Sequence, residues 1–391
     1  MAWRDAETEK RLFIEQCEEA QLSMAELCRQ FGISRQAGYE LRAKHRAFGD
    51  EAFAPRSRRP LHSPTATAPE FVERIVIARK EHPTWGPRKL KDFLERREPA
   101  IAWPARSTFG DLLKRLGFVP DKQRRRRLGG AMSRPFVEAT APNIVWSIDF
   151  KGWFRVGSGE RCDPLTVTDN FSRYCIGCVA VERPTYRYVK PKLVRMFREF
   201  GLPYRMRSDN GPPFGSPALG GLSQLAVWLM KHDVVPEWIA PGRPEQNGRH
   251  ERFHRTLKHE VASPPKATMR AQQRAFDHFR RTYNDERPHE ALGGNCPADL
   301  HVLSARDFSE RVARFEYAAP AIVRRVRSNG EIKWKGKLVF LSQVLHGEAV
   351  ALFPTRIDGE WTVRFRDVEL AVLDERKNKL KKVSPMSPDA V

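Results

Sequence analysis

Three acidic residues in the middle of the chain have the types and surroundings needed for metal-dependent phosphodiester chemistry. Asp149 lies in IVWSIDF, Asp209 in SDNGPPF and Glu251 in GRHERFHRTLK. Phosphodiester transfer requires an oxygen nucleophile, a stabilised pentacoordinate phosphate and a stabilised leaving oxygen, and two divalent ions about 4 Å apart can meet all three needs. Because Mg²⁺ prefers hard oxygen ligands and keeps several waters, a few convergent carboxylates suffice. The sequence therefore predicts a Mg²⁺ or Mn²⁺ site formed by these three side chains.

The third carboxylate has two candidates, Glu245 and Glu251. Glu245 lies in the turn-rich segment PGRPEQNG, whereas Glu251 lies one turn into the predicted helix that follows. At helical spacing Glu251 shares a face with Arg255 and Lys258, whose charges suit DNA phosphates. A helix also holds a ligand more rigidly than a loop does. These points favour Glu251.

The elements that must position these acids form a mixed α/β pattern. Apolar and polar residues alternate from Ile144 to Lys151, which predicts a strand with Asp149 near its middle. Asp209 ends another strand at an Asn-Gly turn, where a carboxylate is well placed in an active-site crevice. We expect strands at 144–150, 162–169, 174–181, 204–209 and 235–240, and helices at 189–200, 219–232, 248–261 and 268–283.

Two helical units precede this region. Residues 1–50 contain three predicted helices, and Ser23 with Glu26 forms a capping box at the second. A helix, a Gly-containing turn and a basic helix suggest a helix-turn-helix, so four side chains of the third helix would face DNA. A plain helical hairpin with a solvated basic face is the alternative. The four side chains are Arg35, Gln36, Tyr39 and Arg42.

A linker at 51–69 leads to a second helical DNA-binding unit at 70–128. Its predicted helices are 71–81, 87–95 and 107–116, with Ser107 as the N-cap of the last. The run Gln123–Arg127 that ends this half is either a solvated tether or a phosphate-tracking segment.

The charge balance points to a polyanionic partner. The chain has 391 residues, with 69 Lys and Arg against 48 Asp and Glu, a formal charge of +21. Such an excess speeds the capture of polyanions, and nucleic acid is the default choice. A basic membrane-surface protein is the other option, but neither an apolar run of spanning length nor a basic amphipathic helix is evident. The six scattered cysteines fit a reducing cytosol better than a disulfide framework.

Two motifs compete with this interpretation. His250, Glu251 and His254 match H-E-x-x-H, in which two histidines of a helix bind Zn²⁺ and the glutamate acts as a general base. A zinc hydrolase would leave Asp149 and Asp209 unexplained. Cys175 and Cys178 have C-x2-C spacing, but residues three apart in a strand point to opposite faces, so buried thiols are expected rather than a zinc site. A third hypothesis, a DNA-binding regulator with an inert core, conflicts with the presence of all three acids.

The ordered set of motifs resembles the insertion-sequence transposases of the retroviral-integrase-like DDE superfamily. The matching pieces are WSIDF, SDNGPPF, PEQNGRHERFHRTLK and YNDERPHEAL, which together span about 150 residues. The resemblance implies a central ribonuclease H-like core at 140–300 with a mixed five-stranded sheet. It also implies metal-dependent 3′-end cleavage and strand transfer of DNA through an Asp-Asp-Glu triad.

The same resemblance settles the choice of glutamate. The family's catalytic Glu follows an Asn/Gln-Gly pair by three positions, as Glu251 follows Asn247-Gly248. The family often has 35 residues between its second and third acids, a count that Glu245 meets (245 − 209 − 1 = 35) and Glu251 exceeds (251 − 209 − 1 = 41). Residues 215–221 read as an insertion that explains the excess. By resemblance, Asn247 lies beside the scissile phosphate, and Arg255 and Lys258 hold the element end.

The resemblance further implies the partners and the remaining domain. Both element ends must be joined, so we expect double-stranded DNA as the partner and a homo-oligomer of at least two copies. A bacterial, nucleoid-associated cytoplasmic protein is expected. Short alternating strands at 315–374 predict a small β-barrel, and residues 375–391 are expected to be disordered.

Overall fold

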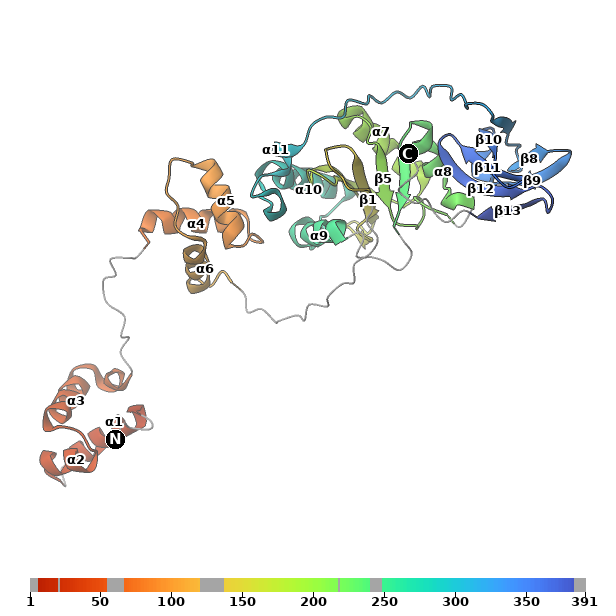
Figure 1. Ribbon diagram of the computed structural model, residues 1–391. Coiled ribbons are helices and arrows are strands. Elements are labelled where there is room, and N and C mark those ends of the chain that lie inside the picture. Colours follow the sequence, from red (N-terminus) through yellow and green to blue (C-terminus); the bar gives the residue numbers. More distant parts are fainter. Residues whose placement is uncertain are drawn as a thin grey trace. The chain divides into compact units, whose positions relative to one another are not determined.

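The computed structural model describes residues 6–19, 22–54, 67–119, 137–216, 219–239 and 248–382, and Figure 1 traces their elements. The chain divides into two compact units, Met1–Thr67 and Ala68–Val391. Among the described residues, no helix has both the length and the apolar character to cross a membrane. The features that fall outside these ranges are most of the 51–69 linker, the Gln123–Arg127 run, Glu245 and Asn247.

The first unit is a three-helix bundle, α1 (Ala6–Glu18), α2 (Met24–Gln30) and α3 (Arg35–Phe48). Ser23 and Ser34 cap α2 and α3 by accepting the backbone N–H groups of Glu26 and Ala37. A short 3₁₀ helix, η1 (Gly49–Phe53), follows, and Phe53 is only 2% exposed in the bundle core. The bundle therefore extends past the predicted boundary at residue 50.

A second three-helix unit opens the other compact region, with α4 (Pro69–Glu81), α5 (Pro87–Arg97) and α6 (Arg106–Arg115). Its buried residues lie three or four positions apart within each helix: Ile75 and Ala78 in α4, Leu90 and Leu94 in α5, and Phe109 and Leu113 in α6. The prediction that Ser107 caps α6 is wrong, because the N-cap is Ala105 and no side chain caps this helix.

The central sheet joins β1 (Val145–Phe150), β3 (Arg161–Asp169), β4 (Cys175–Val181), β5 (Arg205–Ser208) and β6 (Val235–Trp238). A short β2 (Phe154–Arg155) pairs with the start of β3 and makes six strands in all, one more than expected. β3 is antiparallel to β1 and β4, whereas β1, β5 and β6 are parallel. The order β4-β3-β1-β5-β6 is that of a ribonuclease H-like mixed sheet.

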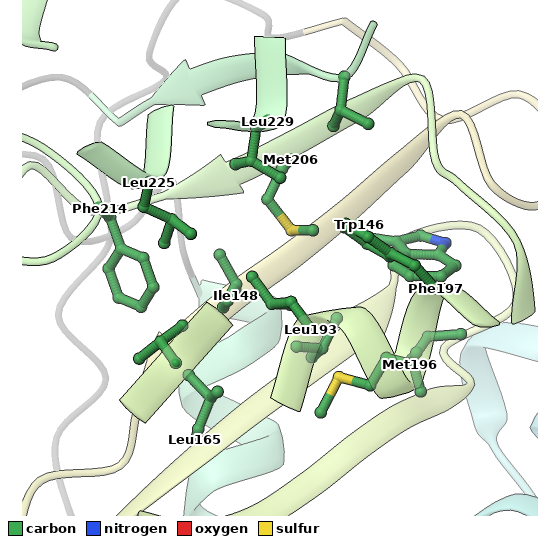
Figure 2. Close-up of a cluster of buried hydrophobic side chains, with 14 of the residues drawn as sticks. Trp146, Ile148, Leu165, Leu193, Met196, Phe197, Met206, Phe214, Leu225 and Leu229 are labelled. Carbon is green, nitrogen blue, oxygen red and sulfur yellow. The ribbon is translucent and has the colours of Figure 1, made fainter. Parts of the chain in front are cut away.

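One face of this sheet is apolar. Trp146, Ile148, Leu165 and Met206 point from the strands into a buried cluster with residues of α7 (Tyr186–Phe200) and α8 (Gln224–Lys231). Figure 2 shows Leu193 of α7 at the centre of this cluster. α8 is buried nearly all round because residues of its other side pack into the apolar cluster of the C-terminal sheet.

The opposite face is covered by α9 (Gly248–Leu257) and α10 (Met269–Arg281), whose apolar side chains meet Cys162, Cys175 and Cys178. Helix α10 also satisfies a backbone group on the outer edge of β4, because Gln273 Oε1 accepts a hydrogen bond from the Ala180 N–H at 2.8 Å. Asn284, in the π-helical turn after α10 (Thr282–Glu286), does the same at Cys175, accepting its N–H at 2.8 Å and donating to its C=O at 3.1 Å. These contacts cover an edge that would otherwise expose unpaired backbone groups.

The C-x2-C pair is buried and unpaired, as expected for inert thiols. The expectation that the two side chains point to opposite faces of the strand is wrong, because Cys175 and Cys178 both lie in the cluster beneath α9 and α10. The β3–β4 ladder shifts register at Val167/Thr168, so Thr166 pairs with Cys178 and Thr168 with Cys175. A β-bulge thus places both thiols on one face.

The C-terminal part is a five-stranded antiparallel sheet, in the order β13-β12-β11-β10-β7, and a two-stranded ribbon of β8 and β9. Among the described residues β7 and β13 pair with one strand each, so the predicted barrel is not confirmed. The prediction of a disordered tail is wrong for residues 375–382: Glu375 accepts from Trp361 Nε1 at 2.9 Å, and β13 pairs with β12. The seven strands are Ile322–Arg325, Glu331–Trp334, Lys337–Phe340, Ala349–Pro354, Glu360–Phe365, Val368–Asp374 and Lys379–Lys382 (β7 to β13).

Candidate active site

Asp149 lies in β1, and Asp209 is the first residue after β5, the parallel strand beside it. The register pairs Val145 with Arg205, Trp146 with Met206 and Ser147 with Arg207, an offset that, carried two residues past the last pair, would place Asp209 level with Asp149. Neighbouring strands lie about 4.8 Å apart. Asp149 comes three residues after Trp146, a member of the apolar cluster, so the pleat directs its side chain to the opposite face, where His254 of α9 lies 3.9 Å away.

The turn after β5 fixes the Asp209 carboxylate. Gly211 N–H donates to its Oδ1 at 3.2 Å, and a Cβ at Gly211 would lie 3.2 Å from Oδ2, tighter than most real contacts. Asn210 Nδ2 donates to Ile239 C=O at 2.6 Å and ties this turn to the end of β6. Partial burial raises the pKa of Asp209, because desolvation penalises its charged form and the Gly211 hydrogen bond offsets this only in part.

Helix α9 is held on this face by buried hydrogen bonds to β3. Thr166 Oγ1 lies 2.7 Å from Nε2 of both His250 and His254, and Thr168 Oγ1 lies 3.2 Å from Nδ1 of His250. Phe253 and Leu257 complete the buried stripe of the helix. Burial lowers the pKa of His250 to about 3 and that of His254 well below its usual range, so both rings are neutral near pH 7.

This packing brings the helix next to the first aspartate. Nδ1 of His254 lies 3.9 Å from Oδ2 of Asp149, and Thr166, the cross-strand partner of Asp149, donates to the Asp149 C=O at 3.0 Å. One ligand atom each from Asp149, His250 and His254 can be chosen within 4.8 Å of one another.

Glu251 lies on the outer side of α9, one helical turn before His254. Its side chain is exposed, and so are those of Arg255 and Lys258, which follow at helical spacing. Residues three apart on a helix have Cβ atoms about 5–6 Å apart, so Glu251 lies close to the residue that contacts Asp149. Asn247 is outside the described residues.

The four predicted DNA-contacting residues lie on α3 in the other compact unit. Arg35, Gln36 and Tyr39 are exposed, and Arg42 is half-buried. Gln36 donates to Glu40 at 3.3 Å. The first three therefore offer side chains to solvent at the start of the predicted recognition helix.

The two-histidine zinc alternative fits this geometry poorly. Thr166 Oγ1 contacts both Nε2 atoms and the Asp149 C=O with a single hydroxyl proton, so at most one Nε2 can accept from it and at least one must carry its own proton. A nitrogen that carries a proton cannot ligate a metal. His250 also has its Nδ1 within reach of Thr168, which leaves Nδ1 of His254 as the remaining ring nitrogen.

Four further residues at the Asp149 site were not expected there from the sequence: Thr166, Thr168, His250 and His254. Two signals were present: the i, i+4 histidines of H-E-x-x-H, and threonines two apart in a strand, which share a face. Neither signal shows that the two pairs meet, since they are about 80 residues apart and α9 must first pack on β3.

Family models match most of the described architecture. An integrase core domain matches residues 139–244, and a second integrase core model matches 232–297. A helix-turn-helix domain matches 9–60 and a homeodomain-like domain 37–113. The C-terminal domain of the IS481 family transposases matches 321–381. Helix-turn-helix units in front of an integrase core, as expected from the sequence, are confirmed.

Relatives carry the names of insertion elements. The chain is 33% identical over 46% of its length to "Insertion element IS407 uncharacterized 31.7 kDa protein" of Burkholderia multivorans. It is 27% identical over 61% of its length to "Insertion element IS476 uncharacterized 39.2 kDa protein" of Xanthomonas euvesicatoria. The chain spans 63% and 66% of the length of these two relatives, just under two thirds of each.

Solved structures are more distant. The HTLV-2 integrase catalytic core domain, in a complex with magnesium, aligns over 42% of this chain and 99% of its own, with 16% identity and a TM-score of 0.34. The matched domains and the insertion-element relatives carry the likeness instead. The chain is similar to insertion-element transposases and contains segments that match an integrase core domain and the C-terminal domain of the IS481 family transposases.

Proposed function

We propose that this chain is a DNA transposase that cleaves the ends of its mobile element and joins them to target DNA, with Asp149, Asp209 and Glu251 as its essential carboxylates. The observation that supports the proposal is the parallel pairing of β1 with β5, in which Asp149 lies in one strand and Asp209 directly follows the other, with α9 beside Asp149. The contact of His254 with Asp149 supports Glu251 as the third acid, because it brings the helix that bears Glu251 to the same place.

A divalent ion, Mg²⁺ or Mn²⁺, suits this donor set. Carboxylate oxygens at adjacent strand ends are hard ligands, and the desolvation of Asp209 leaves a charge that a cation would stabilise. When bound, the ion supplies positive charge at the phosphate and at the attacking and leaving oxygens. Asp149, Asp209 and Glu251 would hold it.

Two transfers account for the reaction. Water attacks the phosphorus at the element end, the bond from phosphorus to the 3′ oxygen breaks, and that oxygen gains a proton as a free 3′-hydroxyl. The hydroxyl then attacks a target phosphodiester, loses its proton, and releases a target 3′-hydroxyl. Arg255 and Lys258, exposed beside Glu251, would neutralise phosphates of the element end. Asn247 would lie beside the scissile phosphate.

The helical units would select the DNA. Arg35, Gln36 and Tyr39 are exposed on α3, where a recognition helix reads base edges, and Arg42 would contact the backbone. The second three-helix unit would bind an adjoining stretch of the same duplex. Because both element ends must be joined, the working form would be a homo-oligomer of at least two copies. A nucleoid-associated protein of the bacterial cytoplasm fits this role.

The direct test is cleavage of duplexes that carry the terminal sequences of the encoding element. The full chain with Mg²⁺ should produce new 3′ ends at the element boundary, and Asp149→Asn should bind the same duplex in a mobility-shift assay without cutting it. A wild-type chain that binds the duplex and never cuts it, with Mg²⁺ or Mn²⁺, would instead identify a DNA-binding regulator with an inert core.

A further inference from the structure

The contact between α9 and β1 contains a nitrogen atom to which the proposed carboxylate site gives no role. We propose that Nδ1 of His254 is a ligand of the divalent ion held at Asp149, so that one imidazole nitrogen stands beside the carboxylate oxygens. The inference rests on the proposed function and refines it, because it concerns the composition of the same metal site.

The protons of the buried network determine which nitrogen of His254 has a free lone pair. Thr166 Oγ1 lies 3.0 Å from the Asp149 C=O, and a proton donated there leaves the hydroxyl able only to accept from the imidazoles. In that arrangement Nε2 of His254, 2.7 Å from Thr166 Oγ1, carries the proton. In the neutral ring Nδ1 then bears the lone pair, and Nδ1 is the atom that lies 3.9 Å from Asp149 Oδ2.

The two atoms are near neighbours but not yet at the spacing of two ligands. A distance of 3.9 Å is too long for a hydrogen bond. Two adjacent ligands of an octahedral ion that each lie about 2.1 Å from it are about 3 Å apart. Asp149 Oδ2 and His254 Nδ1 would therefore approach each other by roughly 1 Å to bind one divalent ion at adjacent positions.

The surroundings of His254 have the form of a supported metal ligand. A ligating histidine usually donates its other N–H to a protein group, which fixes the tautomer and the orientation of the ring. Thr166 Oγ1 is the protein group that would accept the Nε2–H of His254. The same hydroxyl donates to the backbone C=O of Asp149, so it aligns both proposed ligand residues.

His250 provides an internal contrast. It has the same Nε2 contact with Thr166, but its Nδ1 lies 3.2 Å from Thr168 Oγ1. Both of its ring nitrogens thus have partners on β3. We assign His250 a positioning role that keeps α9 on the strand, and only His254 the role of a ligand.

A nitrogen ligand has a measurable consequence for metal choice. Imidazole suits later first-row metals better than Mg²⁺, and affinity rises along the series that begins with Mn²⁺. The full chain should therefore bind Mn²⁺ more tightly than Mg²⁺. Removal of the His254 ring should reduce Mn²⁺ affinity by about tenfold or more. The difference between the affinities for Mn²⁺ and Mg²⁺ should therefore become smaller.

The experiment that tests the ligand directly is pulsed electron paramagnetic resonance of the full chain with Mn²⁺ and no DNA. The wild type should show modulation from a directly bound ¹⁴N nucleus, and labelling of histidine with ¹⁵N should replace it, which excludes a backbone nitrogen. His250→Asn should keep the signal, whereas His254→Asn should lose it and bind Mn²⁺ more weakly. The wild-type labelling result does not depend on whether either variant folds.

Each alternative outcome has one meaning. Mn²⁺ that binds in an Asp149-dependent way without nitrogen coupling would overturn the inference and leave the carboxylate site intact. Coupling that persists in a folded His254→Asn variant would also overturn it. A chain that binds no Mn²⁺ at millimolar concentration and cuts no terminal duplex would overturn both this inference and the proposed function.

Discussion

The two faces of the central sheet are built from different kinds of residue. The face toward α7 and α8 is a buried apolar cluster of Trp, Ile, Leu, Val, Met and Phe side chains, drawn in part in Figure 2. The face toward α9 carries Asp149, Thr166 and Thr168 beside the apolar and thiol side chains that lie beneath α9 and α10. Two buried histidines of α9 form hydrogen bonds with the two threonines.

The difference shows how one sheet separates stability from chemistry. Apolar burial contributes about 25 cal/mol per Å², without regard to direction, so the apolar face can be packed for stability alone. The polar face depends on hydrogen bonds that have fixed partners and directions. Strand β1 contributes to both faces. Trp146 and Ile148 point to the apolar face and Asp149 to the polar face, because successive side chains of a strand alternate between its faces.

The largest effect is expected from the exposed acid beside the polar face. Glu251→Gln should reduce cleavage of the terminal duplex by roughly three orders of magnitude or more, since it removes a proposed metal ligand. Its unfolding transition should match the wild type, because the side chain is exposed. Glu245→Gln is the matched control and should retain activity. The reverse result would assign the third carboxylate to Glu245 and restore the 35-residue spacing.

The next effect is expected on the apolar face. Leu193→Ala, in the fully buried centre of the cluster, should lower the free energy of unfolding by about 2–5 kcal/mol. Denaturant titration measures the loss. Per folded molecule, cleavage should remain near the wild-type rate. A folded variant with its stability intact but its activity lost would show that the two faces are not separable.

A smaller, graded effect is expected from pH. Because burial lowers the pKa of His250 to about 3, the folded state resists a proton that the unfolded chain takes up near pH 6.5. The contribution of neutral His250 to the free energy of unfolding is complete above pH 6.5. It decreases by about 1.4 kcal/mol per pH unit as the pH falls from 6.5 toward 3.

Denaturant titrations between pH 7 and pH 4 measure this slope. His250→Asn should be less stable at pH 7 and should lose stability less steeply on acidification than the wild type. Equal slopes for the two proteins would mean that His250 is not buried in its neutral form, and that α9 is held on β3 in another way.

The smallest effect is expected at the turn after β5. Gly211→Ala would place a Cβ 3.2 Å from Asp209 Oδ2, so the carboxylate must move by a few tenths of an ångström. Mn²⁺ affinity should fall by less than about tenfold, with little change in stability. Calorimetric titration compares the two proteins. Unchanged affinity would indicate that Asp209 adjusts freely, which would weaken the case for a preorganised site.

The sequence by itself determined the element order and the chemistry of the site. Alternation around Asp149, the Asn-Gly turn after Asp209 and the 3.6-residue period of the 248–261 segment are local patterns, so they can be read without knowing the fold. The motif set also carried the resemblance to insertion-element transposases, with which the domain matches agree.

Only the tertiary structure decided which residues meet. The pairing that makes β1, which contains Asp149, the neighbour of β5, which Asp209 follows, comes from hydrogen bonds between strands about 60 residues apart, and His254 reaches Asp149 only after α9 packs on β3. The β-bulge that places Cys175 and Cys178 on one face is likewise a property of the paired strands. Local patterns encode the period of an element, whereas register and docking depend on distant partners, which no short stretch of sequence contains.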